Sequence, residues 1–268
     1  MGSRRLVTVT SLIALGAGIY FYSDPSHLRH ILSVPYDFKM AQGQNLSAFV
    51  LGGTGAVGRE IIKALAQSPQ FTKVTLIGRR QVPLPSPDED KRYDKFDEKI
   101  IDFDNLSEYE DAFKGYDVGF SSLGTTRAQS GAAGFYKVDH DYVINTAKLA
   151  KAGGLRHLHL VSSAGANKNA FFLYPKTKGQ VEEELSTMGF DRLSIYRPGL
   201  LLVDHRDDFR IAEAIFRTII KPLDRFRWFS VDTSLLGSVI VANSFRKEDK
   251  KVEILFNADI NALGKALK

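Results

Sequence analysis

Two serines, a tyrosine and a lysine in the middle of the chain have types and spacings suited to carbonyl chemistry. Tyr174 and Lys178 are four residues apart, so on a helix both side chains lie on one face and reach a common ligand. A tyrosine beside an ammonium group can give and recover a proton near neutral pH, as the reduction of a carbonyl requires. The hydroxyls of Ser162 and Ser163 could hold the carbonyl oxygen. Pro175 suits a first helical turn and places Tyr174 at the helix entrance, although this spacing also occurs on ordinary exposed helix faces.

Three glycines follow a short apolar run earlier in the chain. The run 48–51 leads into Gly52, Gly55 and Gly58, and a stretch with helical periodicity follows. In a strand, turn and helix of this kind, the glycines permit the tight turn, the approach of a pyrophosphate and close helix packing. The phosphates then lie at the helix N-terminus, and an ordinary glycine turn is the alternative. The cofactor contacts predicted here are Gly52, Thr54, Gly55, Ala56, Val57 and Gly58.

Arg79 and Arg80 close the apolar run 73–78, about twenty residues past Gly58, where a dinucleotide-binding fold places the residue that reads the adenine ribose. Enzymes that use NAD have Asp or Glu there, and a carboxylate would repel a 2′-phosphate. A guanidinium group instead binds phosphate oxygens through two parallel charge-assisted hydrogen bonds. The pair therefore predicts NADPH, with Arg79, nearer to the strand end, as the first contact. Two solvated loop arginines are the alternative.

Strand and helix patterns alternate beyond Arg80, which predicts an α/β fold with a Rossmann-type doubly wound parallel sheet and helices on both faces. Further strands are predicted at 99–103, 117–124, 155–163, 193–202 and 252–256, and helices at 106–113 and 138–152. Ligands of such sheets bind outside the carboxyl ends of the strands. This rule adds the contacts Asp102, Phe103, Leu123, Gly124, Thr125, Arg197 and Pro198. Asp102 could accept a hydrogen bond from the adenine amino group, and Leu123 and Gly124 could border the nicotinamide ribose, with a loop cap as the alternative for each.

The composition suits one domain with an appendage. The chain has 268 residues and 44% apolar content, and we divide it into an anchor at 1–22, a tether at 23–46 and an NAD(P)-binding domain at 47–268 that includes C-terminal substrate-side elements. It has no cysteine, and its six histidines are scattered without ligand spacing, so no metal site is predicted. The net charge of +5 is mild, and aromatic residues do not alternate with a basic stripe. Nucleic-acid binding is therefore not expected.

Residues 6–22 form a run without a charge that follows Arg4 and Arg5. As a helix the run would be about 25 Å long, near the lower limit for spanning a bilayer. Aromatic residues at 20–22 resemble an interfacial belt. We therefore predict a retained membrane anchor, with a cleaved signal peptide and a soluble or mitochondrial-presequence form as alternatives. Leu6 stands where a myristoylation motif needs Ser or Thr, so Gly2 is not predicted to be lipidated.

Several of these motifs together resemble an atypical short-chain dehydrogenase/reductase. They are Gly52-x-x-Gly55-x-x-Gly58, Val161-Ser162-Ser163-Ala164-Gly165, Tyr174-x-x-x-Lys178 and Arg197-Pro198-Gly199. Four further segments resemble, more narrowly, the Tat-interacting-protein oxidoreductases and their fungal mitochondrial outer-membrane relatives. They are Leu76-Ile77-Gly78-Arg79-Arg80, Leu123-Gly124-Thr125-Thr126-Arg127, Val138-Asp139-x-Asp141-Tyr142 and Phe172-Leu173-Tyr174. The likeness covers nearly all of residues 47–268.

The resemblance implies a Rossmann fold with bound NADPH, in which each catalytic side chain has a role. Tyr174 would donate the proton, Lys178 would bind ribose and favour the deprotonated tyrosine, and Ser163 would orient the carbonyl. Ser163 is preferred to Ser162 because the short-chain pattern puts its catalytic serine directly before Ala-Gly. The expected activity is the reduction of a small-molecule carbonyl substrate, which is not identified. The alternative is an NADPH-binding regulatory protein that acts through protein partners such as transport receptors.

The hydrophobic N-terminus departs from the soluble Tat-interacting form, and it bears on location. A domain that faces the cytosol from the mitochondrial outer membrane is expected, with the endoplasmic reticulum as the alternative, and NADPH is plentiful on that side.

Residues 203–235 are expected to form part of the substrate pocket wall, with plain core as the alternative. The apolar residues concerned are Phe209, Ile211, Ile215, Phe216, Phe226, Trp228 and Phe229. The oligomeric state is not predicted.

Overall fold

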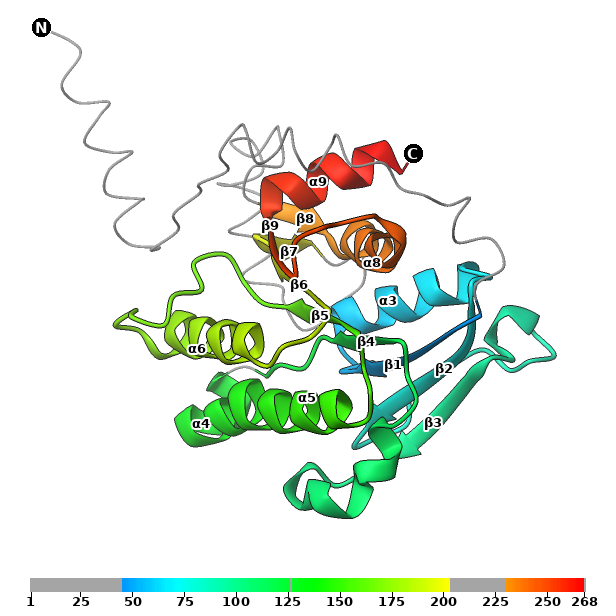
Figure 1. Ribbon diagram of the computed structural model, residues 1–268, viewed down its shortest axis with the longest axis horizontal. Helices are drawn as coiled ribbons and strands as arrows, with labels where there is room; N and C mark the ends of the chain where they lie inside the picture. The colour runs from blue at the N-terminus through cyan, green and yellow to red at the C-terminus, as the bar shows by residue number, and fades with distance from the viewer. Residues whose placement is uncertain (1–44, 126, 203–229, 268) are drawn as a thin grey trace, which may run out of the picture.

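The computed structural model describes residues 45–125, 127–202 and 230–267 (Figure 1). Their central feature is a parallel seven-stranded sheet in the order β3-β2-β1-β4-β5-β6-β9. The strands are β1 Leu46–Leu51, β2 Phe71–Gly78, β3 Phe96–Ile100, β4 Val118–Ser121, β5 His157–Val161, β6 Arg192–Arg197 and β9 Val252–Phe256. A second, two-stranded parallel sheet joins β7 Leu200–Leu202 to β8 Ser230–Asp232. The strand order reverses direction at β1, as in a doubly wound nucleotide-binding sheet.

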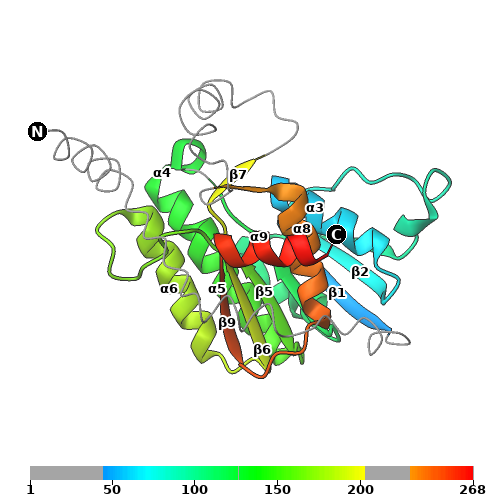
Figure 2. The same ribbon diagram turned by 90° about the horizontal axis from the view of Figure 1, so that it is seen from above.

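Helices cover both faces of the large sheet (Figure 1 and Figure 2). One face carries α3 Ala56–Gln67, α8 Thr233–Ala242 and α9 Asn257–Ala266. The other carries η2 Phe103–Phe113, α4 Arg127–Tyr136, the π-helix η3 Lys137–Asp141, α5 Tyr142–Ala152 and α6 Leu173–Thr187. Two short 3₁₀ turns, η1 Lys91–Tyr93 and η5 Asn243–Phe245, complete the described elements. The predicted Rossmann-type parallel sheet, with helices on both faces, is confirmed.

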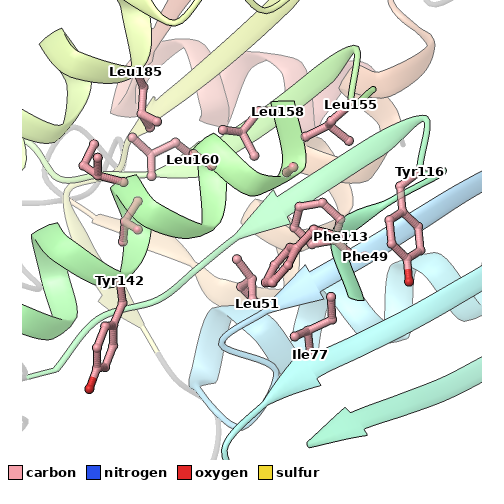
Figure 3. Packing of buried hydrophobic residues seen from close by; sticks show 14 of the residues in the cluster. Phe49, Leu51, Ile77, Phe113, Tyr116, Tyr142, Leu155, Leu158, Leu160 and Leu185 are labelled. Carbon is pink, nitrogen blue, oxygen red and sulfur yellow. The ribbon is translucent and has the colours of Figure 1, made fainter. Parts of the chain in front are cut away.

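Strand β1 shows how one sheet separates two cores. Side chains alternate across a strand, so Phe49 and Leu51 face one side while Ala48 and Val50 face the other, and all four are buried. The first core contains the rings of Phe49 and Phe113, whose centroids are 5.9 Å apart, and it receives the apolar faces of η2, α5 and α6 (Figure 3). The second core is closed by α3, α8 and α9. The amphipathic helix expected after the glycines fills this second layer.

Several predicted boundaries were wrong. The third strand is 96–100 rather than 99–103, and the helix at 106–113 is a kinked 3₁₀ segment that begins at Phe103. The helix predicted from Val138 begins earlier: α4 starts at Arg127, is broken by the non-helical Gly131, and then continues through the π-helix into α5. The run 193–202 forms two strands in different sheets, because Pro198 lacks the N–H that would continue the ladder. The strands predicted at 117–124 and 155–163 are present but shorter, and β9 has the predicted bounds.

A buried polar network lies at the amino ends of β5, β6 and β9. Glu253 accepts hydrogen bonds from Arg192 Nη2 at 2.7 Å, Ser194 Oγ at 2.6 Å and Asn243 Nδ2 at 3.0 Å, and it also pairs with Arg246. Burial opposes the ionisation of Glu253, but the two arginines and the Ser194 hydroxyl outweigh it and hold the pKa of Glu253 below its ordinary value. Arg246 is 1% exposed and pairs with both Glu253 and Glu248, so these two carboxylates balance its buried charge.

Two buried histidines of β5 extend the network. His157 Nε2 is 2.9 Å from Ser194 Oγ, and His159 Nδ1 is 2.9 Å from the hydroxyl of Tyr196. Burial lowers the pKa of both histidines well below the ordinary value of 6.5, and the positive charge of Arg192 adds to the effect. Both rings are therefore neutral at physiological pH.

The described residues contain no helix that is long and apolar enough to cross a membrane. The predicted anchor at 1–22 and nearly all of the tether at 23–46 lie outside the described residues, and β1 begins at Leu46, the tether's last residue. Residues 203–229 of the predicted pocket wall at 203–235, including all the apolar residues named for it, also lie outside them. These expectations stay predictions.

Candidate functional site

The glycine turn after β1 forms one end of the candidate site. Gly52 has φ +81°, and a Cβ atom there would lie 2.6 Å from the carbonyl oxygen of Ser122. The N–H of Gly55 donates to the Gly52 carbonyl at 2.9 Å, and a Cβ atom on Gly58 would lie 2.2 Å from the same oxygen. Side chains are therefore excluded at Gly52 and Gly58, and α3 packs directly on the end of β1.

The start of α3 is open to an anion. Its N-cap is Gly55, which has no side chain to bond the first-turn N–H groups, and the turn reads Ala56-Val57-Gly58-Arg59. A helix N-terminus carries free N–H groups and the positive end of the helix dipole. These groups, beside a turn in which Gly52, Gly53 and Gly55 have no side chains, fit the pyrophosphate of a dinucleotide. Thr54, the remaining residue predicted in this turn, lies between Gly52 and the N-cap and is partly buried.

The sheet register brings the arginine pair to the same edge. Leu51 aligns with Ile77 of β2 and with Ser121 of β4, so the residues after these strands are neighbours. Arg79 and Arg80 follow β2 directly, and both are exposed. Hydrogen bonds from Lys137 and Tyr142 hold the pKa of Asp104 below its ordinary value, and the charge of Arg79 adds to the effect.

Asp102 was predicted to bind the adenine amino group or, alternatively, to cap its own loop, and the structure shows the capping contacts. Its Oδ1 accepts from the N–H of Asp104 at 2.9 Å, and its Oδ2 accepts from Asn105 Nδ2 at 2.9 Å. Phe103 is 4% exposed and packs against Tyr142, with ring centroids 5.1 Å apart. Asp102 itself is exposed at the edge of the site, so the adenine contact stays a prediction.

Tyr174 and Lys178 lie on α6, as predicted. Tyr174 is in the first turn, 48% exposed, and its ring centroid is 5.7 Å from that of the buried Phe135 in α4. Lys178 is 7% exposed, and its Nζ is 2.8 Å from Asp139 Oδ1. A Cβ atom on Gly124 would lie 3.9 Å from this Nζ, so the lysine reaches the loop that follows β4. Leu123 and Thr125 flank Gly124 in that loop, and both are partly buried.

The two serines after β5 have different surroundings. Ser162 Oγ donates to Glu182 Oε1 at 2.5 Å. The Ser163 hydroxyl is buried, and no described residue hydrogen-bonds to it. Ser163 begins a tight turn in which Gly165 has φ +80° and the N–H of Ala166 donates to the Ser163 carbonyl at 3.2 Å. Because a buried hydroxyl without a partner is costly, Ser163 is the serine that is available to a ligand.

The loop that bears Ser163 is fixed against the helix that bears Tyr174. The N–H of Asn167 donates to the Pro175 carbonyl at 2.9 Å, and a Cβ atom on Gly179 would lie 2.2 Å from the Lys168 nitrogen. The loop and the first turns of α6 are therefore in direct backbone contact. The catalytic residues expected from the sequence come from two segments that pack on each other.

Arg197 and Pro198, at the end of β6, have protein partners. The Arg197 guanidinium binds the Glu182 carboxylate, with Nε 3.0 Å from Oε1 and Nη2 2.5 Å from Oε2. The Pro198 carbonyl accepts from the N–H of Ala164 at 2.8 Å, which ties β6 to the serine loop. Their predicted contact with the cofactor stays a prediction.

Two buried acidic residues of the site, Asp139 and Glu182, were not predicted from the sequence. Glu182 follows Lys178 by four residues, and Lys178 follows Tyr174 by the same spacing. This spacing puts Glu182 on the same helix face and could have predicted that it belongs to the site. Asp139 lies in a motif that carried the family resemblance, but nothing in its local pattern predicts a contact with α6. The described residues contain no cluster of potential metal ligands.

A parallel sheet of this order, with a glycine turn leading into α3 at its carboxyl edge, defines a Rossmann-type dinucleotide-binding protein. The solved structure of MoeE5 in complex with UDP-glucose and NAD has the same fold, with a TM-score of 0.59 and 15% identity over 83% of this chain and 82% of that one. A dTDP-glucose 4,6-dehydratase from Streptomyces venezuelae gives a TM-score of 0.56 at 12% identity, over 83% of this chain and 80% of that one. These likenesses concern the fold alone.

The family model described as NAD(P)H-binding matches residues 52–216. The chain is 41% identical over 238 residues to Protein HTATIP2 of Rattus norvegicus, which covers 88% of this chain and 95% of the relative. It is 37% identical over 227 residues to the mitochondrial protein FMP52 of Eremothecium gossypii, with 82% and 98% covered. The chain therefore belongs to the NAD(P)H-binding family, among the relatives of HTATIP2 and FMP52. The resemblance stated from the sequence is confirmed.

Proposed function

We propose that the protein is a membrane-anchored, NADPH-dependent oxidoreductase that reduces a carbonyl substrate through Ser163, Tyr174 and Lys178. The observation that carries the proposal is the buried Ser163 hydroxyl without a partner among the described residues. It belongs to a loop in which the N–H of Asn167 donates to the carbonyl of Pro175, the residue after Tyr174 in the first turn of α6. A hydroxyl without a protein partner at this position could donate a hydrogen bond to a substrate oxygen.

NADPH, held by the glycine turn and by Arg79 and Arg80, would supply the hydride when bound. The Ser163 hydroxyl donates a hydrogen bond to the substrate carbonyl and orients it, and the same bond stabilises negative charge on that oxygen. Tyr174, half exposed at the helix entrance, donates its phenolic proton to the oxygen as an alkoxide develops. The Lys178 ammonium stabilises the phenolate that remains and binds ribose hydroxyls. Ser162 stabilises the serine loop by donating a hydrogen bond to Glu182 of α6.

The preference for NADPH over NADH rests on Arg79 and Arg80. Both side chains are exposed directly after β2, at the edge that holds the glycine turn. A 2′-phosphate carries the charge that two guanidinium groups bind best. Asp104 is the acidic group whose pKa is lowered by its hydrogen bonds and, further, by the charge of Arg79. Its carboxylate already accepts these hydrogen bonds from Lys137 and Tyr142, so the arginines can bind a phosphate instead.

The proposed location follows from the relatives and from residues 6–22. Several fungal relatives, including those from Candida albicans and Scheffersomyces stipitis, carry the word mitochondrial in their names. The uncharged run at 6–22 has the length and flanks of an anchor. We place the domain on the mitochondrial outer membrane, facing the cytosol, where NADPH is plentiful.

The test is NADPH consumption against a panel of carbonyl compounds, with the wild type and Tyr174→Phe. We expect turnover of at least one compound and a fall in kcat of about 10²- to 10⁴-fold in the variant, because the proton donor is lost. Tyr109→Phe removes a hydroxyl from η2, on another part of the fold, and should leave kcat unchanged. Equal rates for wild type and Tyr174→Phe would refute the role of Tyr174. Tight NADPH binding without turnover would indicate a regulatory protein instead.

A further inference from the structure

Asp139 is a buried carboxylate that joins two elements of the candidate site. It is 1% exposed and lies in the π-helix η3, between α4 and α5. Its Oδ1 is 2.8 Å from Lys178 Nζ on α6, and its Oδ2 accepts from the N–H of Thr125 at 2.7 Å. Thr125 belongs to the loop after β4. One carboxylate therefore fixes both the catalytic lysine and the backbone of a neighbouring loop.

The surroundings of the pair leave Lys178 dependent on this carboxylate. The side chains of Lys178 and Asp139 are 9% and 1% exposed, so water does little to stabilise either charge. Among the described residues, Asp139 is the acidic partner of Lys178. A buried ammonium without such a partner is strongly destabilised. The carboxylate thus fixes the position of the lysine.

Gly124 keeps the loop against this ion pair. A Cβ atom at Gly124 would lie 3.3 Å from Asp139 Oδ1 and 3.9 Å from Lys178 Nζ. The backbone of the loop therefore passes beside the ion pair without a side chain between them. Local π-helical turns are rare and often occur at functional sites, and here the turn contains the residue that spans the gap.

We propose that Asp139 is a positioning residue, which holds the Lys178 ammonium and the 123–125 loop in one arrangement for the cofactor ribose and for Tyr174. The inference rests on the proposed function. Both carboxylate oxygens are used as acceptors, one for the ammonium and one for the Thr125 N–H. An amide of the same shape has a single acceptor oxygen and would point its NH₂ group at one of these donors.

The test begins with Asp139→Asn, which is close to the wild type in volume. We expect the variant to lower kcat on the order of 10²-fold, because the lysine loses its fixed position, and to raise the Kd for NADPH about tenfold. Asp141→Asn is the matched control, because Asp141 lies in the same π-helix with a 46% exposed side chain. It should leave both quantities unchanged.

A double-mutant cycle separates positioning from a general structural role. If Asp139 acts through Lys178, Asp139→Asn should change neither kcat nor the NADPH Kd further in a Lys178→Met background. Independent, multiplicative losses would overturn the inference. Should Asp139→Asn fail to fold, Asp139→Glu keeps the charge but displaces it by one methylene. The inference then expects near-normal NADPH affinity with reduced kcat, and an unchanged kcat would contradict it.

The cofactor titration distinguishes this inference from the proposed function. If the wild type reduces no carbonyl in the panel, the proposed function fails, and the cycle measured on the NADPH Kd by cofactor fluorescence still decides the role of Asp139. Coupling between Asp139→Asn and Lys178→Met in that Kd supports the positioning role. Additivity there refutes it even if the enzyme is active.

Discussion

Individual side chains define the chemistry of the site, and the arginine pair gives the first prediction. The double variant Arg79→Ser/Arg80→Ser should raise the Kd for NADPH about 10- to 100-fold, because charge-assisted hydrogen bonds to the 2′-phosphate are lost. The Kd for NADH should change little. Fluorescence titration of both cofactors measures the difference. Arg156→Ser removes an exposed guanidinium that pairs with Asp117 near the start of β5, and should affect neither cofactor. Equal losses for NADPH and NADH would show that the pair does not read the phosphate.

The sequence predicted the residues whose role depends on local spacing. Tyr174 and Lys178 share a helix face, and the first turn of that helix places Tyr174 at its entrance. The choice of Ser163 over Ser162 came from a pattern, and the structure adds a physical reason, since Ser162 is held by Glu182. Asp139 could not be assigned a role, because its contact with Lys178 spans two separate helices. Long-range pairings of this kind leave no periodicity in the chain.

The contact between α3 and β1 gives the prediction at the scale of elements. Gly58→Ala would put a Cβ atom 2.2 Å from the Gly52 carbonyl, so α3 must move away from the strand and from the phosphate position. We expect NADPH affinity to fall at least tenfold, with a loss of stability of about 1–3 kcal/mol from overpacking. Titration of the cofactor and urea unfolding measure the two effects.

Gly78→Ala is the control for this change. A Cβ atom there meets nothing closer than the Arg80 carbonyl oxygen at 3.5 Å, which is ordinary contact. The control should bind NADPH as the wild type does. If Gly58→Ala also binds normally, the close approach of α3 to the glycine turn is not needed for the cofactor.

Elements with one buried face were the ones that the sequence predicted well. α3 and the central strands have regular apolar patterns and lie where they were expected. The edge strand β3 has one neighbour and no fully buried residue, so its pattern is mostly polar and its position was missed. α8 is apolar on nearly every side, with seven buried residues, and therefore lacks the amphipathic period that predicts a helix. The start of α4 was missed because Gly131 and Gly134 weaken its helical pattern.

The stability of the whole molecule should depend on pH through His157 and His159. Burial lowers the pKa of both below 6.5, so the folded state resists protonation while the unfolded state accepts it. Stability is therefore fully present above pH 6.5 and is lost as the pH falls below it, by up to about 1.4 kcal/mol per pH unit for each histidine. Urea unfolding from pH 7.5 to 5.5 measures the slope.

His159→Gln tests the assignment, because glutamine can still bond the Tyr196 hydroxyl but does not titrate. Below pH 6.5 the slope of the unfolding free energy against pH should fall by the contribution of about one proton, because one fewer histidine titrates on unfolding. An unchanged slope would show that His159 does not contribute to it.

The charge network of β6 and β9 gives a second prediction for the whole molecule. Glu253→Gln leaves Arg192 without its buried counter-charge and leaves Arg246 with Glu248 alone, and it should cost about 3–5 kcal/mol of folding free energy. Glu89→Gln, at an exposed loop position, serves as the control in the same chemical denaturation experiment. A cost below about 1 kcal/mol would mean that water reaches the arginines.

The same network constrains the order of events during synthesis. Glu253 follows Arg192 by 61 positions, so at ribosomal speeds of about 5–20 residues per second β6 exists for several seconds before its neutralising carboxylate is made. The sheet from β3 to β5 can assemble in that interval, since its pairings do not involve Glu253. β6 carries Arg192 at its first residue and Arg197 at its last. Translation therefore delays the final docking of a strand whose far end leads to the Pro198 carbonyl that anchors the loop of Ser163.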